Sequence, residues 1–258
     1  MLINNFEPVA IQFFSLEIRW YSLAYIFGIL FAWIYCKKIL IKDKNISKLF
    51  DDLISYIIIG IILGGRLGYV FFYNTKYYLS NPIEILMIWQ GGMSFHGGLL
   101  GVLIATIIFA KKNNVNKYIF LDLISASAPI GIFLGRISNF INSELYGRKT
   151  DVSWSVIFVK VDNISRHPSQ IYEAILEGLI LFLIMYLFIK KNYLKKPGLI
   201  SSLFLIFYST FRFFVEYYRM PDEQLGFIFL NLTMGQFISL IFLCLGLYIF
   251  SKKKNENK

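Results

Sequence analysis

The residues best suited to chemistry lie in one polar stretch of an otherwise apolar chain. This stretch, Gly135 to Gly147, reads GRISNFINSELYG and ends a hydrophobic run long enough to cross a bilayer. Ionisable side chains at membrane depth are costly and usually mark a substrate or ion site. The guanidinium of Arg136 presents donors in a planar fork that suits phosphate or carboxylate. We therefore expect this stretch to bind an anionic group.

Arg136, Asn139 and Ser143 are spaced by three and four residues, so they would share one helix face. Asn139 can both donate and accept hydrogen bonds beside the arginine. The alternative is an arginine that extends to the lipid headgroups from a polar helix end. We favour a binding role because polar residues are dense here and glycines bracket the segment.

A second polar stripe lies further along the chain. Its members follow intervals of four, four and three residues: Tyr208, Arg212, Glu216 and Arg219. These intervals place them on one helix face. An isolated Arg212–Glu216 pair is the alternative, but it leaves Tyr208 and Arg219 unexplained. We expect a second anion-binding element whose arginine is oriented by Glu216.

The stretch Gln90 to Gly101 reads QGGMSFHGGLLG. Its glycines permit close backbone approach, and the start of the next helix would direct free N–H groups at an anion. His96 titrates near physiological pH and is a candidate proton acceptor. A structural histidine is the alternative. We favour catalysis because two arginine-bearing helices are expected at the same level.

Two further segments are less decisive. Gly60, Gly64 and Gly68 form a small-residue seam that tight helix packing explains, so the role of Arg66 stays open between binding and structure. The segment Arg166 to Glu173, RHPSQIYE, carries a helix-start signal and is interpreted as an interfacial cap rather than a polar network. Histidines lack metal-ligand spacing and carboxylates do not cluster, so we expect no metal.

The elements that position these residues must lie in a membrane. The chain has 258 residues, of which 57% are hydrophobic and 18% aromatic, and its mean hydropathy is +0.59. Seven runs approach the ~20 residues that span a bilayer as helix: approximately 18–36, 53–73, 97–112, 119–142, 170–189, 198–217 and 234–251. The sequence predicts an all-α, polytopic membrane protein with a single domain across residues 1–258. It contains no internal repeat.

The charge pattern predicts the topology. The net charge is +10, and most of the 26 lysines and arginines lie in four clusters between apolar runs: 37–48, 111–117, 190–196 and 252–258. This is the positive-inside pattern and not a nucleic-acid-binding face. It places the N-terminus outside and the C-terminus in the cytoplasm.

With this topology, five spans bring polar residues to one outer level: Tyr21, Arg66, His96, the Arg136–Asn139 pair and the Arg212–Arg219 stripe. The outer loop 143–169 carries cations against the positive-inside rule, so these are expected to have partners or a function: Arg148, Lys149, Lys160 and Arg166.

Taken in order, these motifs resemble the bacterial phosphatidylglycerol–prolipoprotein diacylglyceryl transferase family over nearly the whole chain. The matching segments are Arg19–Tyr21, Gly64–Tyr69, Gly91–Gly98, Gly135–Gly147, Arg166–Glu173 and Phe211–Glu216. The resemblance implies an enzyme of the bacterial cytoplasmic (inner) membrane. It would transfer the diacylglyceryl group of phosphatidylglycerol to the lipobox cysteine of a preprolipoprotein, the first step of lipoprotein maturation. A thioether would form and glycerol 1-phosphate would be released.

The resemblance also assigns residues. Positions essential in the family match His96, Arg136 and Arg212. Positions for binding or support match Tyr21, Asn139, Glu144, Gly147, Tyr208 and Glu216. The polar residues at the same predicted level add Arg66 and Arg219 to the substrate-binding set, which also includes Arg136. The expected partners are phosphatidylglycerol, the signal-peptide and lipobox segment of the preprolipoprotein, and membrane lipid, with no nucleic acid and no cofactor.

The chemistry agrees with this assignment. Expulsion of a phosphate monoester builds charge that preorganised cations stabilise, and a thiol nucleophile benefits from a base. An anion or lipid transporter would use the same arginines but needs polar residues through the full membrane depth. A non-catalytic assembly or receptor protein would not need a histidine beside two arginine stripes. The loop 148–165 is shorter than in some relatives, which leaves peptide guidance open.

Overall fold

The computed structural model describes residues 2–14, 16–221, 226 and 231–256. Within these residues the chain forms two compact units. The first comprises residues 1–36 and 122–258, and the second comprises residues 37–121. A single catalytic domain therefore stays a prediction.

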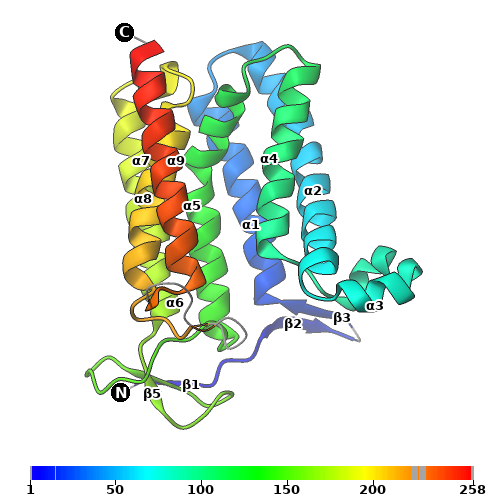
Figure 1. The fold of residues 1–258 in the computed structure, drawn as a ribbon, viewed down its shortest axis with the longest axis vertical. Helices are drawn as coiled ribbons and strands as arrows, with labels where there is room; N and C mark the ends of the chain where they lie inside the picture. Colours follow the sequence, from blue (N-terminus) through cyan, green and yellow to red (C-terminus); the bar gives the residue numbers. More distant parts are fainter. Residues whose placement is uncertain (1, 15, 222–225, 227–230, 257–258) are drawn as a thin grey trace. The chain divides into compact units, whose positions relative to one another are not determined.

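Apolar helices account for most of the structure (Figure 1). Among the described residues, six are long and apolar enough to cross a membrane: Trp20–Leu40, Lys44–Phe72, Phe95–Lys112, Lys117–Ile141, Ser169–Lys190 and Met234–Glu256. A further apolar helix, α8 (Leu199–Val215), is shorter. These helices confirm the polytopic membrane class, whereas the orientation of the termini stays a prediction.

The first unit contains α1 (Trp20–Tyr35), most of α5 (Lys117–Ile141), α8 and α9 (Met234–Glu256), and α8 packs along α9. Between α5 and α8 the chain forms one continuous helix of three parts: α6 (Ser169–Glu173), the π-helical η4 (Ala174–Ile180) and α7 (Leu181–Lys190), followed by the short η5 (Tyr193–Lys195).

Buried Asp122 joins α5 to the start of α8. Its two carboxylate oxygens accept hydrogen bonds from the backbone N–H groups of Gly198 and Ser201, each at 2.7 Å. The first N–H groups of a helix have no partner inside that helix, so a carboxylate from a neighbouring helix satisfies them and suits the helix dipole. Asp122 therefore fixes the axial position of α8 against α5.

Short strands lie next to the helix ends of this unit. β1 (Leu2–Asn4) pairs in parallel with β4 (Val156–Phe158), which pairs antiparallel with β5 (Ser165–Arg166). β2 (Val9–Phe13) and β3 (Leu16–Arg19) form an antiparallel pair before α1. Strands of two to five residues carry too little periodicity to be predicted from hydropathy.

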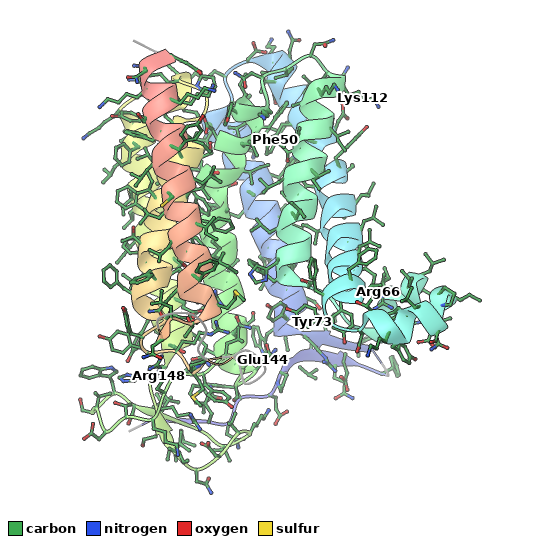
Figure 2. All side chains as sticks on the ribbon, in the orientation of Figure 1. Phe50, Arg66, Tyr73, Lys112, Glu144 and Arg148 are labelled. Carbon is green, nitrogen blue, oxygen red and sulfur yellow. The ribbon has the colours of Figure 1, made fainter. Side chains whose placement is uncertain are left out.

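The second unit is built on α2 (Lys44–Phe72) and α4 (Phe95–Lys112). The predicted glycine seam is confirmed, because a Cβ on Gly64 would overlap the carbonyl oxygen of Gly97 on α4. Three short helices connect the pair: α3 (Thr75–Ser80), η2 (Pro82–Leu86) and η3 (Ile88–Gln90). In Figure 2, Arg66 lies at the end of α2 that leads to these helices, and Lys112 lies at the opposite end of the pair.

The predicted loop 37–48 is largely helical. The first apolar helix continues as the π-helical η1 (Cys36–Leu40), and α2 begins at Lys44, nine residues before the predicted start. Asp43 caps α2 by accepting hydrogen bonds from the N–H groups of Asn45 and Ile46. Lysine is a good helix former, so a hydropathy criterion ends these helices too early.

Candidate active site

A cluster of buried opposite charges occupies the first unit, where α5, α6, η4 and α8 meet. It contains three arginines and three glutamates: Arg136, Arg212, Arg219, Glu173, Glu177 and Glu216. Buried charges are tolerated when they are paired in this way. The cluster therefore unites the two arginine segments that the sequence predicted separately.

Glu173 bridges the two principal arginines. Its Oε2 lies 2.7 Å from Nε of Arg136, and its Oε1 accepts a hydrogen bond of 2.6 Å from Nη1 of Arg212. The Glu173 side chain is 0% exposed, whereas that of Arg136 is 16% exposed. Glu173 thus holds the arginine from the buried side, and part of the Arg136 side chain stays exposed.

Glu177 makes longer contacts with the same arginines. Its Oε2 accepts a hydrogen bond of 3.4 Å from Nη2 of Arg136, and its Oε1 lies 3.7 Å from Nη1 of Arg212. Gly178 permits this approach, since a Cβ there would come within 2.6 Å of the Phe133 side chain on α5. Phe133 lies about one helical turn before Arg136, so the close contact brings η4 to the arginine.

The predicted Arg212–Glu216 pair is present at 2.6 Å, but it is not isolated. Glu216 also lies 3.6 Å from Nη1 of Arg219 and accepts a hydrogen bond of 3.0 Å from the hydroxyl of Thr233. Thr233 precedes α9, and its hydroxyl also caps this helix by accepting from the N–H of Gln236. A carboxylate suits this position beside the positive end of a helix dipole.

Two tyrosines belong to the same unit. Tyr208 lies one helical turn before Arg212 on α8, within electrostatic range of Arg136 and Glu177. Tyr21 is half-buried at the start of α1. The hydroxyl of Ser138 on α5 donates 3.3 Å to the carbonyl oxygen of Trp20, which ties the start of α1 to the Arg136 helix.

The polar segment after Arg136 leaves the helix earlier than expected. α5 ends at Ile141, and Ser143 has φ of +59°, so Ser143 does not share the helix face of Arg136. Ser143 instead donates to the buried Asn4 at 3.5 Å. Asn139 stays on the helix and donates 3.1 Å to Oε2 of Glu144. The glutamate thus holds the turn, with its own side chain exposed (Figure 2).

The segment 166–170 binds the backbone of this turn. Gln170, which is fully buried, donates 2.7 Å to the carbonyl oxygen of Glu144, and Ser169 donates 3.1 Å to that of Leu145. The N–H of Gly147 donates 3.0 Å to the carbonyl of His167, and a Cβ on Gly147 would overlap that carbonyl oxygen. Interpretation of this segment as an interfacial cap was therefore wrong, because it forms a polar network.

Cations of the segment 143–169 have partners in the structure. Arg166 pairs with Asp162, Arg148 donates 2.9 Å to the carbonyl of Arg219, and Lys160 donates 2.6 Å to that of Phe6. The Arg166 guanidinium lowers the pKa of the Asp162 carboxyl from its usual value. Burial lowers the pKa of His167, whose Nδ1 lies 3.2 Å from the hydroxyl of Tyr172. These cations therefore shape the loop.

In the second unit, Arg66 is buried and binds backbone. Its guanidinium donates hydrogen bonds to five carbonyl oxygens, those of Glu84, Ile85, Met87, Gly91 and Gly92. Arg66 also lies over the ring of Tyr78 at 5.0 Å. This geometry favours the structural alternative for Arg66, and a direct substrate contact stays a prediction.

His96 lies in the first turn of α4, inside the helix and not before it. Ser94 caps this helix by accepting a hydrogen bond of 3.2 Å from the N–H of Gly97, and its own N–H donates 2.8 Å to the carbonyl of Gly65. The catalytic role of His96, and its expected membrane level beside Arg136, stay predictions.

The sequence did not assign the two central carboxylates, Glu173 and Glu177, to the site. A signal for Glu177 was present, because it lies inside the predicted span 170–189 and an ionisable residue within a span marks a site. Glu173 was interpreted as part of an interfacial cap, and its pairing with two distant helices leaves no local pattern.

Apolar helices that surround a buried arginine–glutamate cluster define a multi-pass membrane protein with a polar site suited to an anionic group. Residues 8–252 match the family model described as prolipoprotein diacylglyceryl transferase. The chain belongs to this family.

Relatives that carry the name phosphatidylglycerol–prolipoprotein diacylglyceryl transferase include proteins of several Rickettsia species. The protein of Rickettsia bellii (strain OSU 85-389) is 51% identical over 98% of this chain and 97% of its own length. That of Rickettsia felis is 51% identical over 96% of this chain and 97% of its own length. That of Rickettsia typhi is 49% identical over 99% of this chain and its whole length.

Proposed function

We propose that this protein transfers the diacylglyceryl group of phosphatidylglycerol to the thiol of the lipobox cysteine of a preprolipoprotein, in the bacterial inner membrane. The observation that carries the proposal is the Arg136–Glu173–Arg212 bridge, which presents two arginines together in a family with this named activity. Both proposed substrates are membrane-borne, which suits an enzyme built of apolar helices.

In the proposed reaction the cysteine sulfur attacks the glyceryl carbon bound to the phosphate oxygen. The new carbon–sulfur bond replaces the carbon–oxygen bond, glycerol 1-phosphate leaves with the bonding electron pair, and the thiol proton passes to a base. Negative charge grows on the departing phosphate, so Arg136 and Arg212 stabilise the transition state more than the ground state.

The nucleophile belongs to the substrate. A free thiol has a pKa of about 8.5, so only a few per cent is thiolate at neutral pH and a base raises that fraction. His96 is the proposed proton acceptor. Neither Cys36, which is buried and donates to the carbonyl of Leu123, nor Cys244 is needed for direct transfer.

The remaining polar residues have supporting roles in this proposal. Asn139, Glu144 and Gly147 shape the turn that follows Arg136, while Tyr208, Glu216 and Arg219 flank Arg212. Tyr21 and Arg66 complete the proposed substrate-binding set. No finding favours the transporter alternative, which needs polar residues through the full membrane depth. Buried Asp122, a charged residue within α5, has a structural role because it accepts hydrogen bonds from the backbone of α8.

A lipobox peptide incubated with the purified protein and phosphatidylglycerol tests the proposal by mass spectrometry. We expect a diacylglyceryl mass gain on the cysteine and none on a matched peptide with serine in its place. A folded preparation that leaves the cysteine peptide unmodified would refute the transferase activity.

A further inference from the structure

Arg136 and Arg212, which we call the phosphate clamp, lie on different helices. A contact between these helices must therefore set the distance between the two guanidiniums. Arg136 lies near the end of α5, and Arg212 lies near the end of α8. A phosphate held by both needs them at a fixed separation, because misplacement of a catalytic group by about 1 Å can cost 10²-fold in rate.

Glu173 is the residue that contacts both at hydrogen-bond distance. Separate oxygens of the one carboxylate face the two guanidiniums, at 2.7 Å from Arg136 and 2.6 Å from Arg212. Its α6 backbone is fixed in turn, because the adjacent Gln170 and Ser169 bind the carbonyls of Glu144 and Leu145. The same short helix therefore anchors the turn after Arg136 and the spacing of the clamp.

From this geometry we infer that Glu173 is a positioning residue that sets the spacing of Arg136 and Arg212 for the departing phosphate. The inference rests on the proposed function and adds to it a residue that does not touch substrate. The Glu173 side chain is 0% exposed, whereas those of Arg136 and Arg212 are 16% and 10% exposed, so the carboxylate contacts both arginines from their buried side.

Glu173 could set the spacing of the two arginines, or it could only balance their charge. Substitutions that change either the length or the charge of its side chain distinguish these two roles. Aspartate keeps the negative charge but is one methylene shorter, so it cannot reach both guanidiniums from the same backbone. Glutamine keeps the length, but its amide nitrogen would face one guanidinium, donor against donor. A spacing role fails in both variants, whereas a charge-balancing role survives in aspartate.

Glu177 supplies the matched control. It lies one turn further along the same continuous helix, is also 0% exposed, and faces the same arginines at 3.4 and 3.7 Å. Because its contacts are longer, E177Q should affect the clamp less than E173Q does, although both substitutions remove one buried negative charge.

The experiment compares wild type, E173D, E173Q and E177Q as full-length purified proteins. Initial rates of peptide lipidation are measured against phosphatidylglycerol concentration, and melting curves monitor folding. We expect kcat to fall about 100-fold or more in E173D and E173Q, with the KM for phosphatidylglycerol changed less than about fivefold. In E177Q we expect a loss of about tenfold or less.

A kcat for E173D within about threefold of wild type would overturn the inference, since charge alone would then suffice. Equal losses in E173Q and E177Q, or a loss confined to KM, would also overturn it. Should E173Q not fold, E173D decides the question, because it keeps the buried charge. Wild type reports the transferase activity itself, so failure of the proposed function is seen separately as absence of transfer by wild type.

Discussion

At the scale of single residues, the proposed chemistry depends on guanidiniums that buried glutamates hold in place. Arg136 pairs with two glutamates and Arg212 with three, yet Arg136 keeps 16% of its side chain exposed. Each guanidinium is therefore oriented before substrate arrives. Preorganisation of this kind is the main route by which enzymes stabilise charge in a transition state.

Replacement of Arg136 by lysine tests the fork geometry. Lysine keeps the charge but cannot contact Glu173 and Glu177 and also present donors to a phosphate. We expect R136K to lower kcat/KM for lipidation by about 100-fold or more, the usual cost of one lost transition-state donor. Kinetics of the purified variant provide the measurement. Near-normal transfer would contradict the phosphate-clamp role.

His96 is tested by the pH dependence of the rate. In H96Q the proton acceptor is lost, so transfer near neutrality should fall because the substrate thiol is mostly protonated. A rise in pH toward the thiol pKa of about 8.5 restores thiolate without a base, and the variant should then approach wild type. A loss that is constant across pH would instead assign His96 to binding or structure.

At the scale of helices, contacts remote from substrate determine where the arginines lie. Gly178 lets η4 approach α5, and Asp122 fixes the start of α8. The Gly178 contact therefore affects the position of Glu177 on η4, and the Asp122 contact affects the position of Arg212 on α8.

Substitution of Gly178 tests the close approach of η4 to α5. A Cβ at this position meets the backbone and side chain of Phe133 at 2.6 to 3.2 Å, so η4 must move away. We expect G178V to melt at a lower temperature, with a cost of about 1–3 kcal/mol, and to lose most of its transfer activity. Substitution of Gly131, around which a Cβ has open space, serves as the control. Equal behaviour of G178A, G178V and G131A would contradict this packing argument.

Asp122 is tested by removal of its two acceptors. In D122A the N–H groups of Gly198 and Ser201 lose their partner, which costs about 1–2 kcal/mol for a helix cap. We expect D122A to melt at a lower temperature than wild type. The melting temperature of D122N should fall between those of wild type and D122A, because its amide keeps one acceptor oxygen. A melting curve of D122A that coincides with that of wild type would show that this cap does not stabilise α8.

Features that depend on neighbouring residues could be predicted from the sequence, whereas contacts between distant residues could not. Arg136, Arg212 and Glu216 are recognisable as charges in apolar runs. The glycine seam around Gly64 is recognisable because its glycines recur every four residues. The Glu173 bridge, the five carbonyls around Arg66 and the strand formed by Leu2–Asn4 pair residues far apart in the chain. Such pairings have no periodic signal, so they appear only in the folded structure.

At the scale of the whole molecule, the described part of the chain is a set of apolar helices with lysines at helix ends and a buried arginine–glutamate cluster. The lysine-rich ends predict an orientation in which the segment 143–169 lies outside the cell membrane and the segment 190–196 inside.

Cysteine labelling tests that orientation. In a background with Cys36 and Cys244 replaced, we expect K149C to react with a membrane-impermeant maleimide in intact spheroplasts. K195C should react only after the membrane is opened; both positions are exposed in the structure. Labelling in the reverse order would overturn the predicted topology, although the arginine cluster would be unaffected.

The central claim is that the cluster expels the phosphate of phosphatidylglycerol while a cysteine takes the diacylglyceryl group. The most direct measurement counts both products in one reaction, the thioether peptide and the released glycerol phosphate. We expect equal molar amounts of the two with the wild-type protein and neither with R136K. Glycerol phosphate release without thioether, or thioether formed at the wild-type rate by R136K, would contradict the account.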